Sequence, residues 1–208
     1  MITNVYVDGF NLYYGALRGT PFKWLDLGAL CRNLLPKNEI HRIKYFTARV
    51  TPRPTDPNQP ARQAAYLRAL STLANVEIIY GHFLSNSVNL PLATYSANGK
   101  QQYAQVIKTE EKGSDVNIAT HMLYDGFRKN YEVAVLVSND SDLLEPVKLI
   151  KNELGLKVGI INPHQKNSRV LHSQATFVKQ IRTGVLAVSQ FPPVMTDANG
   201  TFHKPPIW

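Results

Sequence analysis

Residues 133–150 have the sequence VAVLVSNDSDLLEPVKLI, an unbroken apolar run followed by two aspartates and then a second apolar pattern. The run Val133–Val137 is typical of a strand that is buried on both faces. The later apolar residues have helical spacing, and Pro146 is tolerated only near a first turn, so we expect a helix from about Asp142. One acid is enough to cap a helix, yet Asp140 and Asp142 both stand here. Capping explains one of them and leaves the pair unexplained.

The same order of strand and helix recurs along the chain. Five apolar or β-branched runs are predicted strands: Ile2–Val7, Ile43–Val50, Val76–Tyr80, Val133–Val137 and Val158–Ile161. The predicted helices are Asp26–Leu35, Pro60–Ala74, Asp115–Phe127, Asp142–Leu154 and Ser168–Ile181. In the third helix the predicted core face carries Val116, Ala119, Leu123 and Phe127. This alternation predicts an α/β fold: a mostly parallel sheet with helices on both faces, in three layers.

Two segments interrupt the alternation. A proline-rich connection covers Thr51–Gln63. The longer segment 85–113 is predicted to contain a hairpin, because SANGK lies between two apolar runs; whether it is a binding loop or flexible decoration stays open. Residues 183–208 are proline-rich and end in Trp208, so we expect an extended tail packed onto one domain of residues 1–182.

The composition limits the classes of function. The chain has 208 residues, of which 44% are hydrophobic, and this is enough to bury a core in one domain. Its formal net charge of +8 favours partners that carry phosphates. The single cysteine, Cys31, excludes an internal disulfide framework and a cysteine-based zinc site. We find neither a signal-peptide pattern nor an apolar run that could span a bilayer, so we expect a soluble, cytoplasmic protein.

Four aspartates stand at the ends of apolar segments, where loops begin: Asp8, Asp115, Asp140 and Asp142. Strand ends and helix starts of an alternating fold meet at the carboxyl-end edge of the sheet, so we expect the four acids to converge there. Two carboxylates ~4 Å apart repel each other by about 4 kcal/mol at an effective dielectric constant of about 20. Either some of these acids stay protonated or a cation lies among them. Oxygen donors without cysteine suit Mg²⁺ or Mn²⁺.

Each of the neighbouring polar side chains has a structural and a functional interpretation. Asn11 can contact a ligand or cap the next helix, and both interpretations stay open. Lys112 can neutralise charge on a phosphate or be a solvated lysine. Glu111 is either a surface charge or an outer acid of a metal site. Ser138 and Asn139, directly before the paired acids, are candidate substrate contacts.

Four arginines on or beside the proline-rich connection form the candidate surface for contacts to a phosphate backbone: Arg49, Arg53, Arg62 and Arg68. The alternative is ordinary surface charge on a helix.

Three segments, in their order and spacing, resemble the NYN domain, a branch of the PIN-like nuclease superfamily, and within it the bacterial LabA-like subgroup. They are VDGFNLYYG, EEKGSDVNIATHML and VLVSNDSDLLEPV, and the closing NGTFHKPPIW is similar to that subgroup's tail. The resemblance covers nearly the whole chain. It implies a PIN-like three-layer sandwich, a divalent-metal site and hydrolysis of RNA phosphodiester bonds.

By position, the resemblance assigns the family's acids to the four aspartates above and its turn asparagine to Asn11. Many PIN-like nucleases carry a further acid after the last core strand, where this chain has Asn162 and, beyond it, Ser168. The number of metal ions therefore stays open.

The sequence thus predicts a metal-dependent endoribonuclease acting on single-stranded regions of RNA. Its catalytic residues would be Asp8, Asn11, Lys112, Asp115, Asp140 and Asp142, with the four aspartates holding Mg²⁺ or Mn²⁺. The rival is a catalytically weak module that binds RNA or a protein partner. An aspartyl phosphatase of the haloacid dehalogenase type is disfavoured, because it needs an acid where this chain has Phe10. DNA as a substrate and a homodimer stay open.

Overall fold

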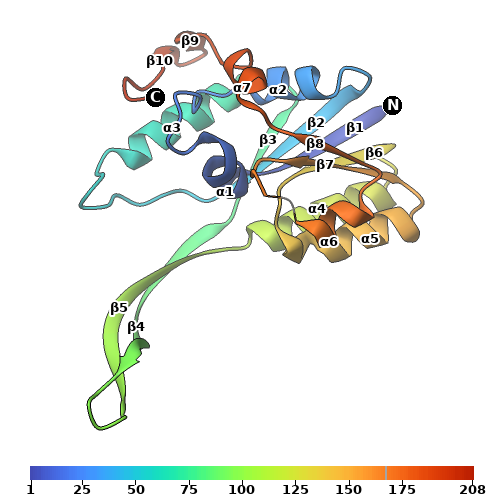
Figure 1. The fold of residues 1–208 in the computed structure, drawn as a ribbon. Helices are drawn as coiled ribbons and strands as arrows, with labels where there is room; N and C mark the ends of the chain where they lie inside the picture. Colours follow the sequence, from blue (N-terminus) through green and yellow to red (C-terminus); the bar gives the residue numbers. More distant parts are fainter. Residues whose placement is uncertain (167) are drawn as a thin grey trace.

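The computed structural model describes residues 1–166 and 168–208, and its centre is one parallel sheet of six strands (Figure 1). The strands are β1 (Ile2–Asp8), β2 (Glu39–Thr47), β3 (Val76–Tyr80), β6 (Val133–Val137), β7 (Lys157–Asn162) and β8 (Phe177–Gln180). Their order is β3-β2-β1-β6-β7-β8, and every neighbouring pair runs parallel. Parallel neighbours need crossover connections, which the helices supply.

Helices cover both faces of the sheet (Figure 1). On one face lie α1 (Gly9–Leu12), a π-helical turn (Tyr13–Leu17), α2 (Leu27–Leu34), α3 (Gln59–Leu70) and α7 (Thr183–Ala187). On the other face lie α4 (Ser114–Phe127), α5 (Leu144–Asn152) and α6 (Arg169–Gln174). Because strand side chains alternate, Val5 and Val7 of β1 enter the first core and Tyr6 the second. The predicted three-layer α/β fold is confirmed.

The chain reverses its direction of travel across the sheet between β1 and β6. From β1 it moves outward to β2 and β3, and it then returns to the other side of β1 to form β6, β7 and β8. In open α/β sheets the crevice outside such a reversal is where ligands bind. This places the expected binding site at the carboxyl ends of β1 and β6.

The prediction of a helix over Ser168–Ile181 was wrong for the second half of that segment. Helix α6 ends at Gln174, and the following residues form β8 at the edge of the sheet. The Phe177 ring packs against the backbone of Gly159 in β7, since a Cβ there would lie 2.2 Å from the ring. The short run FVKQI is compatible with both the helical and the strand period, so the sequence pattern does not decide its conformation. Pairing with β7 makes it a strand.

The predicted core face of the helix Asp115–Phe127 was wrong at Val116 and Phe127, whereas Leu123 does pack against the second core. Val116 is 70% exposed and Phe127 77% exposed, whereas Ile118 and Met122 are fully buried. Helix α4 is apolar on two sides, so periodicity alone could not choose between them.

Segment 85–113 lies in a long antiparallel hairpin, β4 (His82–Tyr95) and β5 (Gln101–Lys112), that extends away from the domain (Figure 1). Residues 183–208 form α7 and a small hairpin, β9 (Val194–Asp197) and β10 (Gly200–His203). The Trp208 ring lies 6.3 Å from Trp24 and 6.0 Å from Tyr66, so the tail packs on the first core. No helix in the described part of the chain is long and apolar enough to cross a membrane.

A buried ion pair joins β2 to α4. Lys44 Nζ lies 2.6 Å from Asp125 Oδ2 and 3.1 Å from His121 Nδ1, and the Tyr6 hydroxyl donates to the same Asp125 carboxylate at 2.8 Å. Although burial acts to raise it, the hydrogen bonds from Lys44 and Tyr6 hold the pKa of Asp125 below its ordinary value. The pair therefore fixes which side of α4 faces the sheet.

We expect Asp125→Asn to destabilise the protein by about 3–5 kcal/mol, because the buried Lys44 would lose its nearest counter-charge and keep only the more distant Glu77, 4.0 Å away. The double variant Lys44→Met with Asp125→Asn removes that uncompensated charge and should recover most of the loss. Urea unfolding of the wild type and both variants measures the two values. A double variant less stable than Asp125→Asn would contradict this account.

Candidate functional site at the carboxyl ends of β1 and β6

The ends of β1 and β6 lie side by side. Val7 pairs with Val137 in parallel register, so Asp8 and Ser138 are the next residues on adjacent strands. On the other side, Asp8 pairs with Phe46 of β2. Asp8 is 5% exposed, which makes it a buried carboxylate at the point where the sheet order reverses.

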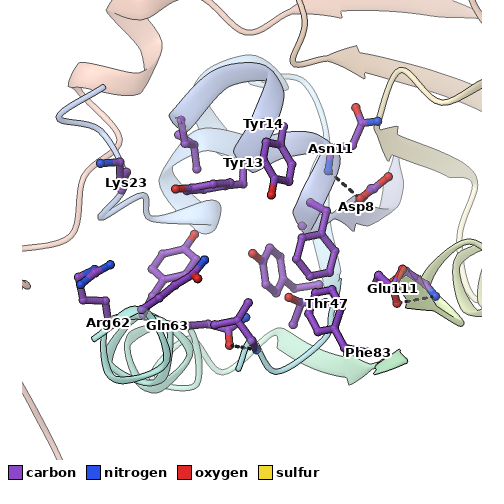
Figure 2. Close-up of a pocket in the computed structure, with 18 of the residues that line it drawn as sticks. Asp8, Asn11, Tyr13, Tyr14, Lys23, Thr47, Arg62, Gln63, Phe83 and Glu111 are labelled. Atoms are coloured by element: carbon purple, nitrogen blue, oxygen red, sulfur yellow. Dashed lines mark hydrogen bonds between the residues drawn. The ribbon is translucent and has the colours of Figure 1, made fainter. Parts of the chain in front are cut away.

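Two hydrogen bonds hold the Asp8 carboxylate. Its Oδ1 accepts from the backbone N–H of Asn11 at 2.9 Å (Figure 2), and its Oδ2 accepts from the Ser138 hydroxyl at 3.1 Å. Asp8 therefore caps α1 and also ties β1 to β6. The next residue has to be glycine, because a Cβ at position 9 would lie 2.6 Å from the Phe46 carbonyl oxygen and 2.7 Å from the Tyr45 ring.

The loop after β6 is built from the same kind of bonds. The Asp140 N–H donates to Ser138 Oγ at 3.1 Å, and Asp140 Oδ1 accepts from the Asp142 N–H at 3.0 Å, capping the 3₁₀ turn Ser141–Leu143. Asn11 Oδ1 accepts from the Asn139 N–H at 3.0 Å, so its side chain fastens α1 to this loop. The Asn139 amide is itself bonded to the backbone of Lys166 and Ser168. Capping thus explains Asp140 but not Asp142.

Helix α4 brings the third acid to the same place. Gly113, with φ of 99°, turns the chain from β5 into the helix, a conformation that favours glycine. Glu111 Oε1 accepts from the Ser114 N–H at 3.2 Å and from its hydroxyl at 2.9 Å, which caps the helix start. Asp115 then lies in the first turn of α4.

These acids line one cavity of about 490 Å³ between the α1 segment and α3 (Figure 2). Its acidic lining residues are Asp8, Asp56, Glu111, Asp115 and Asp140, and its basic ones are Lys23, Arg53 and Arg62. Aromatic residues form much of the rest: Phe10, Tyr13, Tyr14, Tyr45, Tyr66, Phe83 and Trp208. The cavity thus combines a carboxylate end with aromatic walls.

The carboxylates interact electrostatically. Burial is the main reason that the pKa of Asp8 is raised to about 6; the charges of Asp115 and Asp140 raise it too, while the bonds from Asn11 and Ser138 lower it. Burial, followed by the charges of Asp140, Glu111 and Asp142, raises the pKa of Asp115. Negative charge is therefore concentrated here without full compensation. In residues 1–166 and 168–208, however, no three acidic, histidine or cysteine side chains are grouped closely enough to hold an ion as they stand.

Several predicted site residues lie outside the cavity lining, as far as the described residues show. Asp142 is exposed and acts on the site through its charge on Asp115. Lys112 pairs with Glu110 of the same strand at 3.3 Å, the solvated role that the sequence left open. Ser138 and Asn139 hold the loop rather than line the cavity.

The four predicted arginines separate into two groups. Arg53 and Arg62 line the cavity, with Arg62 also paired to Asp56. The Arg49 guanidinium lies over the Tyr80 ring, 4.8 Å from its centroid, and does not line the cavity. Arg68 binds Asp197 through two hydrogen bonds of 2.6 and 2.8 Å and stacks on Phe202 at 4.2 Å, so it anchors the tail. The predicted arginine surface is therefore not continuous.

The aromatic walls were missed by sequence reasoning. The run of two tyrosines in GFNLYYG was a visible signal, since it lies five residues after a candidate acid. Phe10 lies in the same stretch, whereas Tyr45, Tyr66, Phe83 and Trp208 come from β2, α3, β4 and the C-terminal tail, and only the fold brings them together.

Sheet order, helices on both faces and acids at the reversal point define a PIN-like α/β domain. The chain belongs to the NYN domain family, a nuclease-like family whose profile matches residues 2–182.

Two similar proteins are informative. The chain is 30% identical over 234 aligned positions to 6-hydroxy-3-succinoylpyridine 3-monooxygenase HspA of Pseudomonas putida, covering 99% of this chain and 75% of that protein. A crystal structure of a protein of unknown function from Vibrio parahaemolyticus superposes with a TM-score of 0.57 at 18% identity, covering 88% of this chain and 93% of that one. The latter shows the fold alone.

The raised pKa of Asp8 predicts a specific pH dependence of stability. Above pH 6 the folded protein holds a buried, ionised carboxylate, and a rise from 3.8 to about 6 corresponds to about 3 kcal/mol. This cost is absent when Asp8 is protonated in both the folded and unfolded states, and it grows as the pH rises toward 6. Relative to wild type, Asp8→Asn should therefore gain about 3 kcal/mol between acidic pH and neutral pH.

Urea unfolding in EDTA across this pH range measures the difference between Asp8→Asn and wild type. Any constant offset reports packing or a lost hydrogen bond. If the difference in unfolding free energy between Asp8→Asn and wild type does not change with pH, then ionising Asp8 in the folded protein costs no free energy, and the raised pKa is wrong.

Proposed function

We propose that this chain is a metal-dependent endoribonuclease. One observation carries the proposal: Asp8, Asp115 and Asp140 come from three separate elements, line the same cavity at the reversal point of the sheet, and have coupled charges. A structural role accounts for the capping bonds of Asp8 and Asp140. Asp115 stands in the first turn of α4, where the helix dipole favours an acid, but this small gain does not offset its repulsion from Asp140, Glu111 and Asp142 in the absence of a cation.

The donor set fits Mg²⁺ or Mn²⁺. Asp8, Asp115 and Asp140 would hold the ion through carboxylate oxygens, and Asp142 would act through water, because it stands outside the cavity lining of the described residues. When bound, the ion supplies an activated water and stabilises the charge that develops on phosphorus. Because the acids are not yet grouped around one point, we propose that Asp115 and Asp140, less buried than Asp8, adjust when a cation binds.

The chain's own residues would then prepare the site. Asn11 and Ser138 keep Asp8 and the loop after β6 in register, so Asn11 is a positioning residue. Arg53 and Lys23 in the cavity lining would contact phosphates of the strand. Lys112 has a weaker case for a role on the phosphate, since it pairs with Glu110. RNA as the substrate, membership of the LabA-like subgroup and a cytoplasmic location belong to this proposal.

A second candidate is hydroxylation of a pyridine compound. It is favoured by the relative's name and by the cavity, whose volume and aromatic lining suit one small ring compound. The third candidate is a module that binds RNA or a protein with little catalysis.

One set of assays separates the three. Purified chain is incubated with labelled single-stranded RNA or DNA in Mg²⁺, Mn²⁺ or EDTA, and separately with 6-hydroxy-3-succinoylpyridine, a nicotinamide reductant and oxygen. Cleavage of RNA lost in EDTA supports the nuclease. Consumption of the pyridine without RNA cleavage supports the second candidate, and RNA binding without either reaction supports the third.

We expect Asp140→Asn to lower the RNA cleavage rate by about 100-fold or more while the melting temperature is kept, because a metal-binding carboxylate is lost. Glu153→Gln is the matched control, since Glu153 is an exposed acid at the end of α5 on the other face. Wild-type rates in Asp140→Asn would overturn the assignment of the acids.

The two groups of arginines give a second comparison. Arg53→Ala should weaken RNA binding and reduce the slope of log affinity against log salt by about one unit, since a phosphate contact is lost. Arg68→Ala should leave both quantities unchanged but lower the melting temperature, because Arg68 holds Asp197 and Phe202. Equal effects of the two variants on RNA binding would mean that phosphates follow another path.

A further inference from the structure

Tyr13 and Tyr14 form one wall of the cavity, opposite α3 (Figure 2). Their rings meet edge to face, with centroids 5.3 Å apart and an interplanar angle of 79°. Tyr13 packs against the core, whereas Tyr14 is 52% exposed and has the Arg18 guanidinium 5.4 Å from its ring centroid. A large exposed ring at the mouth of a cavity offers a flat apolar face to a ligand.

Local backbone geometry holds this wall in place. The two tyrosines open a π-helical turn, Tyr13–Leu17, a rare conformation that is frequent at functional sites. The His164 ring packs on Gly15 of the same turn, where a Cβ would lie 2.7 Å from the ring. The turn is thus pressed against the loop after β7, and the tyrosine wall is preformed.

The cavity has two chemically different ends. Figure 2 shows Asp8 and Glu111 at one end and Lys23 and Arg62 at the other, with the tyrosines and Gln63 between them. Arg62 is paired with Asp56, while no ion pair of Lys23 occurs among residues 1–166 and 168–208. An aromatic section flanked by a cation-binding end and a basic end matches one nucleotide of a strand, whose sugar carries the base and links the phosphates on either side.

We infer that the aromatic section binds one unstacked nucleobase of a single strand, beside the phosphate held at the acids. This inference rests on the proposed nuclease function and adds to it the compartment that holds a base of the unpaired strand, with Tyr14 as its contact residue. The base would lie against Tyr14, and the adjoining phosphate would reach Lys23 at the basic end. A base in a duplex is stacked and paired, so it cannot enter without being extruded.

The wall opposite the tyrosines offers little to read the identity of the base. Gln63 donates to the Ala48 carbonyl at 2.9 Å and accepts from the Val50 N–H at 2.9 Å, so each half of its amide already holds a backbone partner that fixes its direction. The Tyr66 hydroxyl donates to the Leu25 carbonyl at 3.0 Å. Recognition through ring faces accepts every base, because each base has a π-face. The compartment therefore selects unpaired strands rather than a sequence.

The test measures binding without cleavage. All proteins carry Asp140→Asn, and anisotropy reports the affinity for a labelled single-stranded RNA and for a strand of equal length made of abasic tetrahydrofuran units. Tyr14→Ala removes the ring, and Tyr14→Phe keeps it. Tyr124→Ala is the matched control, because Tyr124 is 60% exposed on α4 and does not line the cavity as described. Thermal melts establish that each variant is folded.

We expect Tyr14→Ala to weaken binding of the RNA by roughly 10- to 100-fold and to leave binding of the abasic strand unchanged. Tyr14→Phe and Tyr124→Ala should bind both strands like the parent protein. Fully paired RNA should bind more weakly than single-stranded RNA, and Tyr14→Ala should reduce this preference.

Unchanged RNA binding by Tyr14→Ala would overturn the inference, as would equal losses on RNA and on the abasic strand. Either result leaves the nuclease proposal standing if Asp140→Asn abolishes cleavage. Conversely, Tyr14 could contribute to base-dependent binding although the chain with Asp140 intact does not cleave RNA. That result would support the base compartment and refute the nuclease proposal.

Discussion

Strand β1 is hydrogen-bonded to β2 on one edge and β6 on the other, and its last residue is the buried carboxylate of Asp8. A buried charge must be hydrogen-bonded, and the bonds come from the start of α1 and from Ser138 at the end of β6. Asn11 adds a second tie by accepting from the Asn139 N–H. The two central strand ends are thus joined by side chains as well as by the sheet. The start of α1, the loop after β6 and the cavity beside them all take their positions from this arrangement.

The same arrangement concentrates negative charge. Asp115 and Asp140 add to the cost of ionising Asp8, which burial already imposes, and the protein holds this unfavourable group at the end of a central strand of the sheet. Natural proteins retain such destabilising groups where function needs them, while stability comes from elsewhere. Here the two cores on either face of the sheet supply it. Under the proposed function, a cation bound by the acids would offset this charge.

One cavity combines the acids with aromatic walls, so both have to be considered when the reaction of this chain is inferred. The family is nuclease-like, while a relative at 30% identity is named as a monooxygenase of a pyridine compound. A fold can host unlike reactions, so the residues around the cavity decide between them. A nucleobase and a pyridine are both planar heteroaromatic rings, and the tyrosine wall formed by Tyr13 and Tyr14 suits either. What favours a strand is the pairing of this wall with carboxylates at one end and Lys23 at the other.

The alternation of strands and helices follows from the sequence alone, because buried parallel strands are short continuous apolar runs and the helices between them begin at capping residues. The sequence also located Asp8, Asp115 and Asp140, since acids at strand ends and helix starts must meet at one edge of a parallel sheet. Tertiary structure alone decided which side of α4 is buried, because both sides are apolar and the pair with Lys44 sets the rotation. Tertiary structure also gave Arg62 and Arg68 different partners. The two residues are six positions apart on α3, so their side chains point in directions that differ by about 240° around the helix axis. Arg62 therefore faces the cavity and Arg68 the tail. The aromatic walls come from segments up to 198 positions apart, from Phe10 to Trp208, and no local pattern records a contact of that span.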